Sequence, residues 1–134
     1  MNAFVMGIDF GSTTAKTVIL DLGGGIVASN VAHMGAVSGQ GVAASVADAL
    51  KDAGLTQADM VRTVSTGYGR RMLDIAEKNY TEITCHARGA VAMVPEARLV
   101  IDIGGQDSKV IAVDANGLVG QVAMDDRCAG GTGK

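Results

Sequence analysis

Short runs rich in Val, Ile, Leu and Ala alternate with glycine turns over most of the chain, and these runs predict β-strands at 4–10, 16–22, 25–32, 60–67, 98–103, 109–115 and 117–124. The segment 41–55 instead places its apolar residues at helical spacing and contains Gly54 near its end, which is typical of an amphipathic helix. Segments 67–79 and 82–94 predict two more helices, the second ended by Pro95. The pattern therefore predicts a mixed α/β fold, with antiparallel hairpins inside a larger sheet and flanking helices.

The predicted strands contain an internal repeat. IDFGSTTAK at 8–16 reappears as IDIGGQDSK at 101–109, which is 93 residues later, with four of the nine positions identical. At the same offset Asp21 corresponds to Asp114, and Gly24 corresponds to Gly117. The same three-stranded meander is therefore expected twice in the chain.

Each repeat combines a strand that ends near an aspartate, a glycine turn and a lysine. Such a turn gathers backbone N–H groups, small polar side chains and one cation around a compact anion, and phosphate is the natural ligand. The candidate phosphate-binding residues are Gly11, Ser12, Thr13, Thr14 and Lys16 in the first copy, and Gly104, Gly105, Gln106 and Lys109 in the second.

Asp9 and Asp102 occupy equivalent positions in the two copies. A pseudo-twofold relationship would place their carboxylates on opposite sides of one cleft, where they could hold Mg²⁺ through water. The alternative is that the two turns serve backbone geometry alone. Repetition of the whole nine-residue pattern favours phosphate binding over that alternative.

Two other glycine-rich segments fail as phosphate motifs. CAGGTGK at 128–134 lacks the first glycine of a Walker loop, and no Ser or Thr follows its lysine. GYGRRM at 67–72 lacks the third glycine of a dinucleotide fingerprint. Neither segment supports a separate nucleotide site.

Composition and charge exclude several classes of partner. The 134 residues carry a net charge of −3 and only 3% aromatic residues, so neither a cationic surface for nucleic acid or anionic lipid nor a set of base-stacking platforms is expected. The two cysteines are too few for a disulfide scaffold, and the start of the chain has no secretory signal pattern. We therefore expect a cytoplasmic protein with no nucleic-acid or membrane partner.

The two repeated motifs resemble the phosphate-1 and phosphate-2 motifs of the superfamily of acetate and sugar kinases, heat-shock chaperones and actin. A closer resemblance is to the ATP-dependent activators of 2-hydroxyacyl-CoA dehydratases and the related ATPase subunits of benzoyl-CoA reductase. That resemblance is carried by STGYGR at 65–70, ITCHARGA at 83–90, IDIGGQDSK at 101–109 and MDDRCAGGTGK at 124–134. It implies an actin-like (ribonuclease H-like) ATPase fold.

The resemblance also implies cofactors and partners. Members of this family act as homodimers that bind ATP or ADP with Mg²⁺, carry one 4Fe–4S cluster at the twofold interface, and pass a low-potential electron to an acyl-CoA dehydratase or reductase. By this resemblance Cys128 matches a cluster ligand, Asp9 matches the first phosphate site, and Asp102 and Gln106 match the second. In the intact protein we expect Mg²⁺ near the two aspartates to aid the attack of water on the γ-phosphate, with Gln106 orienting that water. The remaining matches are Gly11, Ser12, Thr13 and Lys16 at the first phosphate site, and Gly104 and Gly105 at the second.

Residues 1–134 match the N-terminal part of this family. The resemblance places the second cluster cysteine, the adenosine-binding motif and the second half of the fold beyond residue 134, so we expect neither cluster assembly nor ATP turnover from this piece alone. No cluster role is assigned to Cys85, which is expected to be a small buried apolar residue, or to His86, whose ring nitrogen is expected to be satisfied.

Two other functions fit the same motifs. The first is a small-molecule kinase of this superfamily, in which a sugar or carboxylate takes the place of water. The second is a non-catalytic actin-like module whose nucleotide serves only as a conformational switch.

Overall fold

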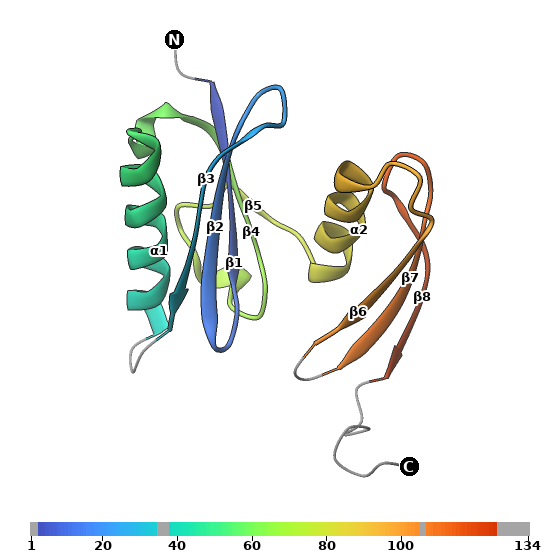
Figure 1. Cartoon of the computed structure of the whole chain (residues 1–134). Coiled ribbons are helices and arrows are strands. Elements are labelled where there is room, and N and C mark those ends of the chain that lie inside the picture. The colour runs from blue at the N-terminus through green and yellow to red at the C-terminus, as the bar shows by residue number, and fades with distance from the viewer. Residues whose placement is uncertain (1–2, 35–37, 105–106, 126–134) are drawn as a thin grey trace. The chain divides into compact units, whose positions relative to one another are not determined.

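The computed structural model describes residues 3–34, 38–104 and 107–125, and the chain divides into two compact units (Figure 1). Unit 1 comprises residues 1–81 and unit 2 comprises residues 82–134. No helix in the described part of the chain is both long and apolar enough to span a membrane.

Unit 1 is built on a five-stranded mixed sheet with strand order β3-β2-β1-β4-β5. The strands are β1 (Phe4–Phe10), β2 (Thr14–Asp21), β3 (Ile26–His33), β4 (Met60–Thr66) and β5 (Lys78–Asn79). The β1–β2 and β2–β3 pairs are antiparallel, whereas β4 lies parallel to both β1 and β5. The predicted arrangement of antiparallel hairpins within a larger sheet is confirmed.

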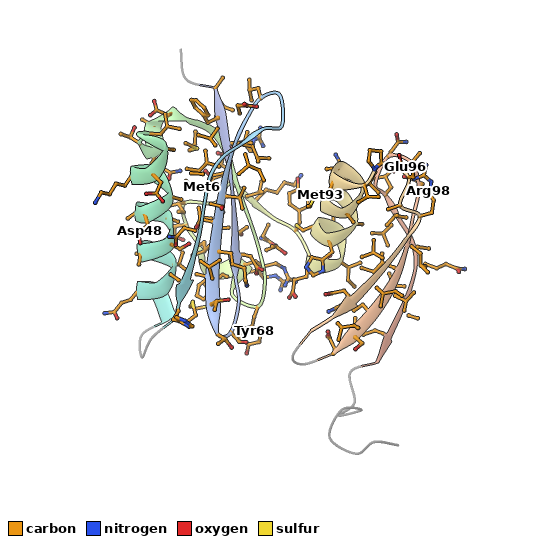
Figure 2. All side chains as sticks on the ribbon, in the orientation of Figure 1. Met6, Asp48, Tyr68, Met93, Glu96 and Arg98 are labelled. Carbon is orange, nitrogen blue, oxygen red and sulfur yellow. The ribbon has the colours of Figure 1, made fainter. Side chains whose placement is uncertain are left out.

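Helix α1 (Ser38–Ala53) covers one face of this sheet. Its buried residues recur at helical spacing, as at Val42, Val46 and Ala49, and they share one hydrophobic cluster with Met6 of β1. Figure 2 shows Met6 and the exposed Asp48 of α1 among the side chains of this unit. Burial of this apolar stripe is what holds the helix against the strands.

The predicted end of α1 at Gly54 is confirmed. The Gly54 N–H donates to the carbonyl oxygen of Lys51 at 3.1 Å, and the Leu55 N–H donates to that of Leu50 at 3.0 Å. This pair of bonds satisfies carbonyl groups that would otherwise lack partners at the helix terminus.

Unit 2 contains a three-stranded antiparallel sheet of β6 (Leu99–Ile103), β7 (Ser108–Val113) and β8 (Val119–Asp125), together with helix α2 (Glu82–Met93). The strand register repeats that of unit 1 residue by residue at the offset of 93: Asp9 pairs with Lys16, and Asp102 pairs with Lys109. The irregularity near the end of β2 also recurs near the end of β7. The predicted duplication of the meander is confirmed at the level of the backbone.

The two sheets differ in which face their helix covers. Ile8 faces α1 and is 1% exposed, whereas the equivalent Ile101 is 64% exposed. In unit 2 the helix packs through Ala87 against Ile111 and Val113, which lie on the opposite face of the repeat. The sequence repeat therefore extends to strands and turns but not to helix placement.

The predicted helix at 67–79 is wrong. The segment forms one 3₁₀ turn (Arg70–Met72) and then the short strand β5. The end of the segment pairs with β4 through backbone hydrogen bonds. The Glu77 N–H donates to the carbonyl oxygen of Thr63, and the Tyr80 N–H donates to that of Ser65, both at 2.9 Å. A second 3₁₀ turn (Gln57–Asp59) leads into β4.

Candidate nucleotide-binding site

Asp9 and Lys16 stand at the two sides of the first glycine turn. They are paired across β1 and β2, and Lys16 Nζ lies 3.2 Å from Asp9 Oδ2. The Lys16 side chain is 43% exposed and the Asp9 side chain is 34% exposed. Water therefore screens this ion pair, and its net stabilisation is about 1 kcal/mol or less. Both partners can therefore exchange this contact for the charges of a ligand at low cost.

The first turn presents polar groups between these two residues. The Gly11 N–H donates to the carbonyl oxygen of Thr14 at 3.0 Å, which closes the turn and leaves Ser12 and Thr13 exposed at its tip. The carbonyl oxygen of Thr13 accepts a 3.0 Å hydrogen bond from the Met34 N–H, and this bond anchors the tip of the turn to the residue that follows β3. An exposed but anchored turn of this kind suits an anion that carries several acceptor oxygens.

Gly67 lies directly against Asp9, and none of the sequence motifs indicated it as a site residue. Its φ is +94°, and a Cβ at this position would collide with Asp9 Oδ1 and with the carbonyl oxygen of Phe10. The neighbouring Gly69 N–H donates to that same carbonyl at 2.9 Å. The available signal was a pair of closely spaced glycines at the end of a predicted strand, outside any known phosphate fingerprint.

Arg70 has a structural role in this loop. Its guanidinium donates to the carbonyl oxygen of Gly67 at 3.1 Å, and its own carbonyl oxygen accepts from Ser65 Oγ at 2.7 Å. Arg71 is exposed, as is Tyr68 at 84%, which Figure 2 labels in unit 1. Arg70 therefore stabilises the loop, whereas the neighbouring Arg71 faces solvent.

The second turn is closed by the matching backbone hydrogen bond, but its side chains differ in chemistry. The Gly104 N–H donates to the carbonyl oxygen of Asp107 at 2.9 Å, just as Gly11 does to Thr14. Asp107 places a carboxylate where the first turn has a hydroxyl, and its Oδ1 lies 2.6 Å from Lys109 Nζ. Lys109 is thereby held mainly by Asp107, and its Nζ stands 3.8 Å from Asp102 Oδ2.

The ammonium group of Lys109 is much less accessible than that of Lys16, since its side chain is 9% exposed. The hydrogen bond to Asp107 raises the pKa of Lys109, and this effect outweighs the opposing effect of burial. The negative charges of Asp107, Asp102 and Glu82 raise this pKa further. Lys109 is therefore a fixed cation at the base of the second turn.

His86 reaches the same carboxylate from α2. Its Nδ1 lies 3.0 Å from Asp102 Oδ2, yet this buried nitrogen makes no aligned hydrogen bond with any described residue. The distance is within hydrogen-bond range, so the alignment and not the separation is what this contact lacks. Nδ1 therefore has no aligned partner among the described residues, and the expectation of a satisfied ring nitrogen stays a prediction. The expectation of a buried Cys85 is wrong, because that free thiol is only half-buried.

Several predicted site residues fall outside the part of the chain that the structure describes. These are Gly105, Gln106 and Cys128. Asp9 belongs to unit 1 and Asp102 to unit 2, so their pairing across one cleft stays a prediction. What the structure establishes is that each aspartate lies beside its own glycine turn and its own lysine.

Comparison with known proteins identifies the group of proteins that share these turns. The profile of the BadF/BadG/BcrA/BcrD ATPase family matches residues 6–134. The chain belongs to this family. The activator of lactoyl-CoA dehydratase from Anaerotignum propionicum is 45% identical over 131 residues, covering 98% of this chain and 50% of that protein. The chain thus spans about half the length of the curated relatives it matches.

Two solved structures of such ATPases have the same fold. Component A of the (R)-2-hydroxyglutaryl-CoA dehydratase of Acidaminococcus fermentans matches with a TM-score of 0.90 at 45% identity, over 98% of this chain and 50% of that one. The activator of 2-hydroxyisocaproyl-CoA dehydratase from Clostridium difficile, with bound ADPNP, matches with a TM-score of 0.83 at 41% identity. This second match covers 94% of this chain and 47% of the other. The expected actin-like ATPase fold and the expected family are confirmed.

Proposed function

We propose that the protein carrying this chain binds the phosphates of ATP at its two repeated turns and hydrolyses the nucleotide. The observation that carries this proposal is the duplicated register pair, Asp9 with Lys16 and Asp102 with Lys109, each beside a closed glycine turn. The ADPNP in the structure of the related activator from Clostridium difficile supports ATP as the ligand.

The exposed groups of the first turn would contact the phosphates in two different ways. Ser12 and Thr13 supply hydroxyl and backbone donors, and Lys16 supplies a cation that can leave its solvent-screened pair with Asp9. In the second turn Gln106 is proposed to orient the attacking water. Catalysis of phosphoryl transfer depends mainly on such positioning and on charge stabilisation.

The carboxylates fit a magnesium site. Asp9 and Asp102 are hard oxygen donors, their side chains are 34% and 25% exposed, and Mg²⁺ usually keeps several waters and takes few protein ligands. When bound, Mg²⁺ would neutralise charge on the phosphate oxygens. The role of the two aspartates is then to accept hydrogen bonds from its waters and to fix their orientation.

The partner we propose is a 2-hydroxyacyl-CoA dehydratase or a related benzoyl-CoA reductase. The names of the most similar relatives support a dehydratase, since they are activators of such enzymes. The finer proposal is that a homodimer shares one 4Fe–4S cluster and delivers one low-potential electron for each activation. Cys128 as an iron ligand is supported by the resemblance of the segment 124–134 alone, since the only cysteine among the described residues is Cys85.

Nucleotide binding can be tested with three matched Asp→Asn variants of the full-length protein. Asp9→Asn and Asp102→Asn should each lower kcat for ATP hydrolysis by about 100-fold or more, in line with the loss of one charge-stabilising group. Asp48→Asn, on the exposed face of α1, should leave kcat unchanged. Equal activity of all three variants would contradict the assignment of the two turns.

The electron-transfer role needs a separate experiment. Anaerobically purified protein should contain iron and show visible absorbance, Cys128→Ala should lose both, and Cys85→Ala should keep both. Iron-free wild-type protein that phosphorylates a sugar or carboxylate would instead establish the small-molecule kinase. Iron-free protein with slow turnover that forms filaments, unaffected by any acyl-CoA enzyme, would establish the nucleotide switch.

A further inference from the structure

The two repeats hold their aspartates differently, although the registers of their paired strands match. In the first turn Lys16 Nζ lies 3.2 Å from Asp9 Oδ2. In the second turn Lys109 lies 2.6 Å from Asp107 Oδ1 and only 3.8 Å from Asp102 Oδ2. The replacement of a threonine by Asp107 at the matching position has therefore drawn the lysine away from the repeated aspartate.

His86 lies where that contact has been weakened. Its Nδ1 is 3.0 Å from Asp102 Oδ2, closer than the lysine is. It comes from α2, whose position is fixed by Ala87 and its neighbours Ile83 and Val91 packing against the sheet. His86 lies three residues after Ile83 and therefore on the same side of the helix.

The electrostatic surroundings favour a donor at this place. Glu82, Asp102 and Asp107 bring three carboxylates around the single ammonium group of Lys109. The hydrogen bond between Lys109 and Asp107 occupies the best donor that the strands supply. His86 Nδ1 is buried, lies within donor distance of Asp102 Oδ2 and has no aligned partner among the described residues. A small rotation of the imidazole ring would align an Nδ1–H with this carboxylate and give Asp102 a donor of its own.

We propose that His86 is a positioning residue that fixes the carboxylate of Asp102 through Nδ1–H, and this inference rests on the proposed ATPase function. The contacts from His86 and Lys109 both fall on Oδ2 of Asp102. Holding Oδ2 fixes the plane of the carboxylate and leaves Oδ1 free to accept a hydrogen bond from a ligand or its waters. The first turn has no need of such a residue, because Lys16 already contacts Asp9 closely.

The contact itself can be tested without any nucleotide. Long-range ¹H–¹⁵N spectra of the full-length protein at pH 9, assigned by the signals lost in His86→Asn, report which ring nitrogen carries the proton in the neutral ring. We expect the Nδ1–H tautomer in the wild type and a shift toward Nε2–H in Asp102→Asn. An Nε2–H tautomer in the wild type that is unaffected by Asp102→Asn would overturn the proposal.

The consequence for hydrolysis is tested with two replacements of the same side chain. His86→Ala should lower kcat by about 10-fold to 100-fold, with KM for MgATP changed by less than about threefold, as is typical when a supporting partner of a functional group is lost. His86→Asn should recover most of kcat, because its amide N–H₂ lies close to the position of Nδ1. Met93→Gln is the control, because Met93 lies on the same helix and is 85% exposed; it should leave kcat and KM unchanged.

These outcomes separate the inference from the proposed function. If the wild type hydrolyses ATP while His86→Ala and His86→Asn lose kcat equally, or lose only stability, His86 is a packing residue and the positioning role is wrong. If the wild type binds and hydrolyses no ATP, the proposed function fails and the role in hydrolysis fails with it. The tautomer measurement would then report the His86–Asp102 contact on its own.

Discussion

Asp114 closes the β7–β8 turn with the same side-chain oxygen that Asp21 uses in the β2–β3 turn. In both cases Oδ1 accepts hydrogen bonds from the backbone N–H groups two and four residues further on, at 2.9 Å each in the first turn and at 2.8 and 2.9 Å in the second. Gly24 and Gly117 follow each aspartate at the same distance along the chain, with φ of +88° and +78°. The turn chemistry has therefore been kept together with the strand register.

Replacing Asp114 should weaken unit 2 in a pH-dependent way. The backbone hydrogen bonds from Leu118 and Asn116 lower the pKa of Asp114 from its usual value of 3.8. A carboxylate with a lowered pKa contributes stability that is present above pH 3.8 and is lost as the pH falls through the folded-state pKa. Asp114→Ala should therefore lower the urea midpoint at pH 7, and the difference from the wild type should narrow as the pH falls below 3.8.

The matched control for this prediction is Asp114→Asn. Its amide oxygen can still accept the two backbone bonds, but it carries no charge and does not titrate. It should lie between the wild type and Asp114→Ala at pH 7. A constant difference between wild type and Asp114→Ala at every pH would mean that the charged carboxylate is not what stabilises the turn.

Gly67→Ala should disturb both the fold and the first turn. The left-handed φ of +94° and the collision of a Cβ with Asp9 and Phe10 make this substitution strained, at a cost of about 1–3 kcal/mol in the free energy of unfolding. Displacement of Asp9 should also weaken ADPNP binding, measured by calorimetry. Gly89→Ala, in open space on α2, should instead stabilise the protein by about 0.5–1 kcal/mol.

The sequence predicted most strands and both turns because each repeat carries its structure locally. Alternating apolar residues define the strands, and the residues Asp-x-Gly-Gly or Asp-x-Asn-Gly near 21 and 114 define the connecting turns. The helix predicted at 67–79 was wrong because the edge of β4 took up its backbone groups, and the apolar residue Met72 remained 67% exposed. A nonlocal strand contact of this kind leaves no periodic signal in a single sequence.

The details of the site were less accessible from sequence. Lys16 and Lys109 occupy matching positions, yet the first is 43% and the second 9% exposed. The difference depends on Asp107, which is not one of the four identical positions of the repeat, and on α2, which lies outside the repeat. The contact of His86 with Asp102 joins residues that are 16 positions apart, and a helix register that only packing sets determines it.

The two lysines should therefore respond differently to loss of charge. Lys109→Met removes the cation from two carboxylates whose side chains are each 25% exposed and should cost about 1–3 kcal/mol in the free energy of unfolding. Lys16→Met removes a solvent-screened pair and should cost about 1 kcal/mol or less, while it weakens nucleotide binding. Urea unfolding and ADPNP titration of both variants would test this, and equal stability of the two would contradict it.

The raised pKa of Lys109 adds a pH signature to that comparison. A group whose folded-state pKa lies above its unfolded value of 10.5 contributes stability that is complete below this value and is lost as the pH rises through the folded-state pKa. The wild type should therefore lose stability above pH 10.5 more steeply than Lys109→Met does. Parallel alkaline unfolding curves for the two proteins would show that Lys109 is not held by its carboxylates.

The core beneath the first turn contains one polar pair whose contribution can be isolated. Thr17 Oγ1 of β2 and Ser45 Oγ of α1 lie 2.8 Å apart, both residues are fully buried, and Ser45 Oγ also donates to the carbonyl oxygen of Asn30 at 3.3 Å. Ser45→Ala leaves the Thr17 hydroxyl without this partner and should cost about 1–3 kcal/mol. Thr17→Val should cost less, because Ser45 keeps its bond to Asn30.

A double-mutant cycle decides whether the two hydroxyls act as a unit. Once Thr17 is Val, removal of the Ser45 hydroxyl no longer strands a buried partner, so the double variant should be more stable than the sum of the single losses predicts by about 0.5–1.5 kcal/mol. Urea unfolding of the four proteins gives this coupling energy directly. Strict additivity would mean that the two hydroxyls do not stabilise one another, and that the Thr17–Ser45 contact contributes nothing to holding α1 against β2.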